Sequence, residues 1–548
     1  MPLQKNQVLT LRVERLSSDG SGVAHSPDGE TVFIPGAAPG DEARVRIVKD
    51  CKRYAFGILD EVLTPSPDRI PVDCAVAGPC GGCSLRHLDY AAELRAKQEN
   101  VADAFARIGG LDVPVLPIVG SPEVNRYRNK VQFPVGVDKS GKPCIGFYAG
   151  RTHRIVPCPD CRLQPGVLNE IGNALCAFFA EKGIQPYSEE TGRGLVRHIF
   201  LRRGAHSGQI MVCLVCTRAR LPSAEELCTR LKAQFAEITT ILLNVNAKNT
   251  NVILGTETHT LYGQGYIEDT LCGVPVQLGP LSFYQVNTLA AEQLYGIAAQ
   301  YAQLTPDDLL LDLYCGMGTI GLSMAAHCRE LIGVEIVPEA IESAKANAAR
   351  MGADVAAKSR FFCADAGQAA TRLAAEGLHP DIVMLDPPRK GCDEATLSAV
   401  VRMSPRRVVY VSCNPATAAR DAAWLEQNGY HAEKVQPVDL FPRTRHCEAV
   451  LLLTKLNVER HIEVDVSMDE LDVTAAESKA TYDEIKAYVL EKHGLKVSSL
   501  YISQVKRKCG LDVGQNYNLS KKEDAKVPQC PPEKEAAIME ALKHFQML

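Results

Sequence analysis

One thiol stands where a short apolar segment meets a turn. Residues 409–411 are Val, Tyr and Val, and Ser412, Cys413, Asn414 and Pro415 follow directly. A short apolar run bounded by turn-forming residues is typical of a buried strand. The pattern therefore predicts that Cys413 ends a strand, where its thiol can act as a nucleophile. For a lone cysteine, burial as a small apolar side chain is the alternative.

A glycine-rich turn further upstream can hold a ligand. Asp312 lies in an apolar run, and Gly316 and Gly318 follow it. Glycines in such a turn let a ligand approach the backbone at the start of a helix. Glu335 ends the next apolar run, where a carboxylate can bind ribose hydroxyls. This pattern fits a nicotinamide dinucleotide as well as S-adenosylmethionine.

Two further carboxylates favour methyl transfer to a pyrimidine. Asp386 begins an Asp-Pro-Pro motif after the apolar run 382–385, and Glu448 opens a later apolar run. Methyltransferases that act on amino groups usually have an aromatic residue after the prolines, whereas Arg389 stands here. Carbon 5 of uracil is a poor nucleophile that a thiolate activates by adding to carbon 6. A base must then remove the carbon 5 proton, and Glu448 is the candidate.

Four cysteines have the spacing of a metal or iron–sulfur site. Cys74, Cys80 and Cys83 lie close together among glycines, which let the backbone bring several thiolates to one centre. Three such ligands suggest a fourth, and the pair Cys158 and Cys161 is the obvious source. Four cysteines suit either zinc or an iron–sulfur cluster. Burial of unrelated cysteines is the alternative.

The composition indicates a cytoplasmic protein of several domains. The chain has 548 residues, 20 cysteines and a net charge of -5. No apolar run is long enough to span a bilayer, and residues 1–7 lack the apolar core of a signal peptide, so we expect neither a membrane partner nor disulfides. Residues 1–250 hold 31 Lys and Arg against 26 Asp and Glu, a mildly basic balance that suits contact with a polyanion.

Four regions differ in their residue patterns. Residues 1–64 alternate between apolar and polar, which predicts a small β-barrel of the oligonucleotide-binding kind. Residues 65–285 contain a helical pattern at 90–107 and are otherwise β-rich. From 286 to 455, strand and helix patterns alternate, which predicts a doubly wound, Rossmann-like α/β domain with a mainly parallel sheet. Residues 456–548 form a small appended α+β extension.

The extension combines a strand pattern with helix signals. Residues 461–466 alternate, and an acidic stretch follows at 469–472. Thr481 and Glu484 form a capping box that starts a helix, and Gly494 can end it. A basic triplet, Lys506-Arg507-Lys508, follows.

Arginines mixed with aromatic residues mark the central region as a candidate RNA-binding surface. Such mixtures suit contacts with phosphates and bases. A solvated, charged strand face is the alternative. The residues concerned are Arg126, Tyr127, Arg128, Asn129, Lys130, Arg193, Arg197, His198, Arg202 and Arg203.

Together, these motifs resemble the bacterial RNA uracil-5-methyltransferase family. The resemblance covers about residues 5–455. It implies a class I methyltransferase domain, an N-terminal TRAM domain and a [4Fe-4S] cluster, as in the branch of the family that acts on 23S ribosomal RNA. The motifs that carry it are Asp312–Gly321, Asp386-Pro-Pro-Arg389, Ser412-Cys413-Asn414-Pro415 and His446-x-Glu448.

The resemblance also implies roles for individual residues. Cys413 matches the nucleophile and Glu448 the proton-abstracting base. Tyr314 stands where Phe is common, and Cys158 offers a second thiol beside Cys161. The residues that match the S-adenosylmethionine site are Gln285, Tyr314, Gly316, Gly318, Glu335, Asp365 and Asp386, and the cluster ligands are Cys74, Cys80, Cys83 and Cys161.

The expected reaction is S-adenosylmethionine-dependent methylation of carbon 5 of a uridine in 23S ribosomal RNA through a covalent cysteine–uracil adduct. Formation of 5-methyluridine in transfer RNA is an alternative, although that branch typically lacks the barrel and the four cysteines. Cytosine-5 methylation usually requires a cysteine directly after the proline motif, and none is present. A non-catalytic RNA-binding or RNA-folding module is a further alternative. We expect a monomer that does not bind DNA.

Overall fold

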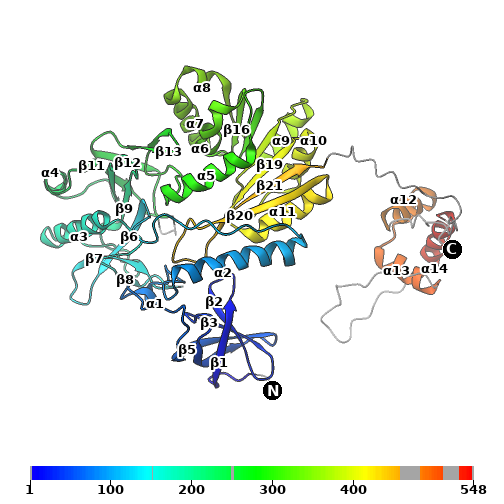
Figure 1. Ribbon diagram of the computed structural model, residues 1–548, viewed down its shortest axis with the longest axis horizontal. Coiled ribbons are helices and arrows are strands. Elements are labelled where there is room, and N and C mark those ends of the chain that lie inside the picture. Colours follow the sequence, from blue (N-terminus) through cyan, green and yellow to red (C-terminus); the bar gives the residue numbers. More distant parts are fainter. Residues whose placement is uncertain (1–2, 151, 249–251, 457–481, 510–529, 546–548) are drawn as a thin grey trace. The chain divides into compact units, whose positions relative to one another are not determined.

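The computed structural model describes all residues except 1–2, 151, 249–251, 457–481, 510–529 and 546–548 (Figure 1). The chain divides into two compact units, Met1–Val458 and Glu459–Leu548. The first unit contains an N-terminal barrel, a central sheet and an α/β domain. Within the described residues, no helix combines the length and the apolar character needed to cross a membrane.

The N-terminal residues fold into a closed five-stranded barrel, as their alternation predicted. The strands follow the order β1-β2-β3-β5-β4. Alternation turns one face of each strand inward, so Leu11, Val13, Val32, Ile34 and Val45 form the barrel core. The strands are β1 (Val8–Leu16), β2 (Ser21–His25), β3 (Thr31–Pro35), β4 (Glu42–Asp50) and β5 (Tyr54–Thr64).

A long helix connects the barrel to the rest of the unit. In α2 (Tyr90–Asp103), the Asp89 carboxylate caps the first turn by accepting a backbone hydrogen bond at 3.0 Å. A π-helical turn, η1 (Ala104–Gly109), continues it, so the helix predicted at 90–107 is confirmed. The one-turn helix α1 (Ala77–Cys80) precedes α2. Figure 1 shows α2 between the barrel and the α/β domain.

The central region forms a seven-stranded sheet of order β12-β11-β10-β9-β6-β7-β8. Its two faces have different neighbours, because successive strand residues point to opposite sides. Ile199 packs with α3 (Gly166–Glu181) and α4 (Ala224–Gln234), whereas Phe200 joins the core of the α/β domain. The strands are β6 (Lys130–Val137), β7 (Pro143–Tyr148), β8 (Ile155–Pro157), β9 (Val196–Arg203), β10 (Ile210–Cys216), β11 (Ile238–Val245) and β12 (Glu257–Tyr262), and a hairpin follows of β13 (Ile267–Leu271) and β14 (Val274–Leu278).

Two central arginines bind the chain itself rather than face solvent. Arg202 is 1% exposed, and its guanidinium donates to the carbonyl oxygens of Gly279 at 2.8 Å and Ser282 at 2.7 Å. Arg197 likewise donates to two backbone carbonyls, at 2.6 and 3.1 Å. The interpretation of these two residues as RNA contacts is therefore wrong. Arg202 instead holds the loop that leads to Gln285.

The α/β domain has the predicted doubly wound sheet, of order β17-β16-β15-β18-β19-β21-β20. The sheet is parallel except for β21, which runs antiparallel to both of its neighbours. The strands are β15 (Leu309–Leu313), β16 (Glu330–Glu335), β17 (Ser359–Cys363), β18 (Ile382–Leu385), β19 (Arg407–Ser412), β20 (Tyr430–Val438) and β21 (Glu448–Lys455), and the helices are α5 (Thr288–Ala302), α6 (Thr319–Met324), the 3-10 turn η2 (Ala325–His327), α7 (Pro338–Met351), α8 (Ala353–Lys358), α9 (Ala366–Ala375), α10 (Glu394–Met403) and α11 (Pro415–Gln427).

The second unit contains three described helices around a small apolar core. The core includes Ile485, Ile502 and Ile538. Gly494, at a φ of 66°, follows the first helix, as predicted. The helices are α12 (Tyr482–His493), α13 (Ser499–Lys508) and α14 (Pro532–His544). The strand pattern predicted at 461–466, the acidic stretch 469–472 and Thr481 of the capping box lie outside the described residues.

Candidate active site

Cys413 lies between β19 and α11, at the carboxyl edge of the parallel strands. Asn414 caps α11, because its side-chain oxygen accepts a hydrogen bond from the Ala416 N–H at 3.2 Å, and Pro415 suits the first helical position. The Asn414 N–H donates to the Ser412 hydroxyl at 3.0 Å, and that hydroxyl donates to the Asn414 carbonyl at 3.1 Å. These bonds fix the turn and leave the Cys413 thiol half-buried beside a cavity.

The strand register brings Cys413 opposite Glu448. Ser412 of β19 pairs with Ala449 of the antiparallel β21, so Cys413 and Glu448 are the next residues along the two strands. Burial and the Asp386 carboxylate raise the pKa of Glu448 to about 8. Burial, Glu448 and Asp386 together raise the pKa of Cys413 to about 11. Cys413 is therefore a protonated thiol at neutral pH, and the carboxyl group of Glu448 beside it ionises near neutral pH.

Arg389 is the cation that acts on this pair. Its positive charge lowers the pKa of both Cys413 and Glu448, since it favours the thiolate and the carboxylate. Its backbone carbonyl accepts a hydrogen bond from the Asn414 side-chain amide at 3.0 Å, which joins the Asp386-Pro-Pro turn to the Cys413 turn. The sequence placed Arg389 in a motif but assigned it no role.

Three carboxylates gather at the carboxyl ends of adjacent strands. Asp312 lies on β15, Glu335 ends β16, and Asp386 follows β18. Burial raises the pKa of Asp386 to about 7. Burial, together with repulsion from Asp386 and Glu335, raises the pKa of Asp312 to about 8. A group of acids that are buried or partly buried favours a positively charged ligand.

The turn after β15 is built from residues of positive φ. Gly316 and Gly318 have φ values of 55° and 79°, and Tyr314, which is not a glycine, has 66°. The Gly316 N–H donates to the Glu335 carboxylate at 3.2 Å, so the turn and the carboxylate are joined. Asp365, after the neighbouring strand β17, caps α9 by accepting a backbone hydrogen bond at 3.1 Å.

Tyr295 joins this site, although its sequence position carries no signal. It lies on α5, is 4% exposed, and its hydroxyl hydrogen-bonds with the side chains of Gln285 and Thr319. Burial, followed by the Asp386 carboxylate, raises the pKa of Tyr295. Tyr295 therefore links Gln285 to the neighbourhood of Asp386. The spacing of Tyr295 on α5 is that of an ordinary core residue, so periodicity could not distinguish it.

These residues fit S-adenosylmethionine. Asp312 Oδ1 is buried and has no hydrogen-bond partner within the described part of the chain. A ligand with an ammonium and a sulfonium group can supply the positive charge that such an acceptor requires. A Cβ at Gly316 would meet no atom within 4 Å, so space beside the turn is open. Glu335 stands where ribose hydroxyls bind in this fold.

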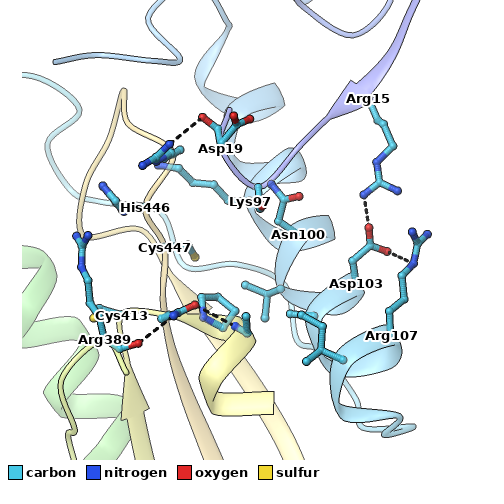
Figure 2. Close-up of a pocket in the computed structure, with 18 residues that line it drawn as sticks. Arg15, Asp19, Lys97, Asn100, Asp103, Arg107, Arg389, Cys413, His446 and Cys447 are labelled. Atoms are coloured by element: carbon cyan, nitrogen blue, oxygen red, sulfur yellow. Dashed lines mark hydrogen bonds and ion pairs between the residues drawn. The ribbon is translucent and has the colours of Figure 1, made fainter. Parts of the chain in front are cut away.

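A cavity of about 580 Å³ lies beside Cys413 (Figure 2). The barrel, α2 with η1, and the α/β domain all contribute to its wall. Figure 2 shows Arg15 and Arg107 both turned toward Asp103, with which they form ion pairs. Arg389 and three residues of the β20–β21 loop line the other side. Guanidinium groups bind phosphates well, so the cavity suits RNA.

The predicted cluster cysteines lie close to one another. Besides burial, the thiols of Cys161, Cys83 and Cys74 raise the pKa of Cys80. Within the described residues, no group of three or more His, Cys, Asp or Glu side chains is arranged to hold a metal ion. A single zinc ion requires each sulfur at about 2.3 Å. An iron–sulfur cluster is larger, so its thiolates lie farther apart.

Two neighbouring residues bear on the choice of ligands. Cys158 is 3% exposed, and its hydrogen bond with the Cys161 sulfur lowers the pKa of Cys161. Backbone N–H groups of Leu163 and Gln164 also hydrogen-bond to the Cys161 sulfur and favour the thiolate that a ligand requires. Arg86 lies beside Cys83, where its charge favours the thiolate, and its Nε and Nη2 atoms are buried without a hydrogen-bond partner in the described chain. A buried cation with unused donors fits an anionic iron–sulfur cluster.

Comparisons with known proteins identify the family. Residues 206–456 match the family described as tRNA (Uracil-5-)-methyltransferase, and residues 2–59 match the TRAM domain. An uncharacterized RNA methyltransferase of Halalkalibacterium halodurans is 43% identical over 457 residues, which are 83% of this chain and 99% of the relative. The chain belongs to the RNA uracil-5-methyltransferase family. A second relative, from Oceanobacillus iheyensis, is 41% identical over 455 residues, which are 83% of this chain and 98% of that protein.

A solved structure agrees with this membership of the uracil-5-methyltransferase family. Pyrococcus abyssi tRNA (uracil-54, C5)-methyltransferase, in complex with S-adenosyl-L-homocysteine, is 26% identical with a TM-score of 0.65. The similarity covers 81% of this chain and 100% of that one. The predicted fold is confirmed, and the protein is an S-adenosylmethionine-dependent RNA methyltransferase with a TRAM domain.

Proposed function

We propose that this enzyme methylates carbon 5 of a uridine in 23S ribosomal RNA through a covalent bond to Cys413. The observation that carries the proposal is the placement of Cys413 opposite Glu448 at a cavity lined by arginines. A nucleophile and a proton acceptor on facing strands can act in turn on one pyrimidine ring. Residues 1–64 would bind RNA, 65–285 would bind RNA and the cluster, and 286–455 would transfer the methyl group.

The reaction begins at Cys413. Loss of its proton gives a thiolate that bonds to carbon 6 of a uracil flipped from its RNA context, and the carbon 5–carbon 6 π electrons move toward carbon 5 and oxygen 4. Arg389 assists this step, because its charge lowers the pKa of Cys413. S-adenosylmethionine, when bound, supplies the electrophilic methyl group that carbon 5 takes up.

Glu448 acts in the second half. Its carboxylate accepts the carbon 5 proton, the electrons of that C–H bond restore the carbon 5–carbon 6 double bond, and Cys413 leaves as a thiolate. The pKa of Glu448, raised to about 8, lies near the neutral range in which a general base is most effective. Both side chains return to their starting states after proton exchange with water.

We assign the S-adenosylmethionine site to the carboxyl ends of the central parallel strands. Glu335 would bind the ribose, and Asp386 would lie between the cofactor and the uracil. The hydrogen bond from Gly316 to Glu335 and the unpartnered Asp312 oxygen support the assignment. The complete set is Gln285, Tyr314, Gly316, Gly318, Glu335, Asp365 and Asp386.

We also assign a [4Fe-4S] cluster to Cys74, Cys80, Cys83 and Cys161. The proximity of the four thiols and the buried donors of Arg86 support it. Anaerobically purified protein should contain equal amounts of iron and sulfide and absorb near ~400 nm. Zinc without sulfide would contradict the assignment.

Transfer RNA is the second candidate substrate, because the Pyrococcus abyssi relative and the matching family are both named for it. The similarity to the Pyrococcus abyssi enzyme covers 81% of this chain, more than residues 65–455 alone, so the barrel does not separate the two substrates. The preference for ribosomal RNA rests on the resemblance of the four cysteines to the cluster ligands of the ribosomal-RNA branch. Purified enzyme should methylate 23S ribosomal RNA, but not transfer RNA, from a strain that lacks this protein. Methylation of transfer RNA alone would contradict the proposal, and RNA binding without methyl transfer would favour a non-catalytic module.

Trapping on 5-fluorouridine RNA tests the covalent step. Fluorine replaces the proton that Glu448 removes, so the adduct cannot resolve and should accumulate on the wild-type protein. Cys413→Ala should abolish the adduct. Cys363→Ala, which removes an exposed thiol at the end of β17, is the matched control and should trap normally. An adduct that persists in Cys413→Ala would exclude this cysteine as the nucleophile.

A further inference from the structure

The loop between β20 and β21, residues 439–447, leads directly into Glu448. His446 in this loop lines the cavity beside Cys413. Val438 pairs with Glu448, so the loop and the proposed base belong to one hairpin. A shift of the loop would therefore move the Glu448 carboxyl relative to Cys413.

Lys97, on α2, holds the start of this loop. Its Nζ atom donates to Asp439 Oδ1 at 2.8 Å, to Glu93 Oε1 at 2.7 Å and to the Phe441 carbonyl at 3.2 Å. The three charged side chains are buried, with Lys97 2% exposed and both carboxylates 0%. Figure 2 places Lys97 on α2 opposite the loop that bears His446. Helix α2, which lies outside the α/β domain, thus binds the loop that precedes Glu448 in the chain.

The same stretch of chain also holds the middle of the loop. Glu93 accepts a hydrogen bond from the Arg443 N–H at 2.7 Å. The Arg443 guanidinium donates to the Leu88 carbonyl at 2.8 Å, and the Arg443 carbonyl accepts from the Leu85 N–H at 3.1 Å. Leu85 lies two residues after Cys83, so the chain passes from the cysteine set directly into these contacts.

This buried network is better suited to fixing a geometry than to stabilising the fold. Removing several charges from water opposes most of the attraction between them. Two carboxylates share the ammonium group of Lys97. Glu93 Oε2 lies 3.5 Å from the Arg443 guanidinium and has no hydrogen-bond partner in the described chain. In a low-dielectric interior, a buried charge that loses its partner is costly. Lys97, Glu93 and Asp439 therefore restrict the loop to the position in which they are paired.

We propose that Glu93 and Lys97 are positioning residues for Glu448. They hold the β20–β21 loop so that the carboxyl of Glu448 faces carbon 5 after Cys413 has added to carbon 6. This role rests on the proposed function of Glu448. It extends that function, because residues of α2 would then influence the removal of the carbon 5 proton and the release of Cys413. Cys413 lies in the β19–α11 turn, whose hydrogen bonds involve neither Glu93 nor Lys97, so we expect its attack to change less than the later proton removal.

The two halves of the reaction can be measured separately with the full-length protein, unmodified substrate RNA and S-adenosylmethionine labelled in its methyl group. Denaturing gels report methylated RNA bound to protein, and nuclease digestion reports released 5-methyluridine. Lys97→Met and Glu93→Gln should form the adduct at about the wild-type rate and release it about tenfold more slowly, because a small displacement of a catalytic group has a large effect. The adduct should therefore accumulate.

Two further variants separate positioning from stability. Tyr90→Phe removes only the hydroxyl that donates to Asp439 at 2.9 Å, and it should also accumulate adduct. Arg406→Met is the matched control, because it breaks an ion pair with Asp308 of 2.5 Å at the opposite end of β19, and it should accumulate none. Trypsin should cleave after Arg443 faster in Lys97→Met than in Arg406→Met.

Equal losses of adduct formation and release in these variants would overturn the role of Glu93 and Lys97. If Lys97→Met does not fold, Glu93→Gln and Tyr90→Phe decide. Failure of the proposed function looks different, because wild-type protein would then form no adduct on 5-fluorouridine RNA, or Glu448→Gln would release product normally. Either result would remove the base that Glu93 and Lys97 are proposed to position.

Discussion

Two groups of thiols in this protein differ in the charges that surround them, although burial raises the pKa of both Cys413 and Cys83. Cys413 lies beside the carboxyl groups of Glu448 and Asp386, and burial with these charges raises its pKa to about 11. Among the proposed cluster ligands, Cys83 and Cys161 lie near guanidinium groups instead. The charge of Arg86 favours the thiolate of Cys83, and the Arg126 guanidinium donates to the Cys161 carbonyl at 2.8 Å.

The difference shows how one side-chain type can serve two purposes. A ligand must remain a thiolate, and a nearby cation favours that state. A nucleophile that works in turn with a carboxylate needs its thiolate only during attack, and a protonated thiol resists oxidation and alkylation between turnovers. The charges around each thiol, rather than the thiol itself, therefore distinguish the proposed roles.

The largest effect should come from removing the carboxylate beside Cys413. Glu448→Gln cannot accept the carbon 5 proton, so release of product should fall by about 10²–10⁴-fold while methylated adduct accumulates. Denaturing gels measure the RNA-linked protein, and nuclease digestion measures the released 5-methyluridine. Glu433→Gln, a change on the exposed face of β20, should behave as wild type. Normal release by Glu448→Gln would exclude it as the base.

A second test exchanges single thiols in the cysteine set. Cys161→Ser should lose most of its iron and sulfide, because it removes a proposed ligand. Cys158→Ser should retain most of both, because the proposed fourth ligand is Cys161 and Cys158 hydrogen-bonds to its sulfur. Iron and sulfide per chain in anaerobic protein measure the difference. Equal retention by the two variants would show that either thiol can serve as the fourth ligand.

The pH dependence of alkylation gives a smaller, more specific test. Below a pKa of about 11, the thiolate fraction of Cys413 grows about tenfold per pH unit, so its rate of reaction with iodoacetamide should rise throughout pH 7–10. Asp386→Asn removes a repelling charge, so it should lower this pKa and speed alkylation several-fold at a given pH. Mass spectrometry of the Cys413 peptide measures the rate, and an unchanged rate would show that Asp386 does not act on the thiol.

The smallest expected effect is on stability. Asp312, Asp386 and Glu448 have folded-state pKa values of about 8, 7 and 8, above the unfolded values near 4. Unfolding then releases protons, so stability should fall as pH rises from about 4 to 8 and change little above that. The thermal midpoint should therefore drop by a few degrees between pH 5.5 and 8, and less so in Asp386→Asn. A midpoint that rises with pH would contradict these directions.

Much of the site was predictable because strand ends are visible in a sequence. Apolar runs bounded by turn-forming residues located the ends of β15, β16, β18 and β19, and therefore Asp312, Glu335, Asp386 and Cys413. Arg197 and Arg202 were misinterpreted, because an arginine on a strand does not reveal which carbonyl groups lie within its reach. Tyr295 and Lys97 gave no signal, since each matches the spacing of an ordinary helical residue.

The sequence by itself determined which chemical groups are present and which element ends carry them, because local periodicity and turn residues set the ends of strands and helices. Only the tertiary structure decided which groups meet. The antiparallel register of β21 places Glu448 opposite Cys413, and the packing of α2 places Lys97 against the loop before Glu448. Both contacts join residues distant in the chain. Burial in the assembled fold, rather than local sequence, shifts the pKa of Asp386, Glu448 and Cys413.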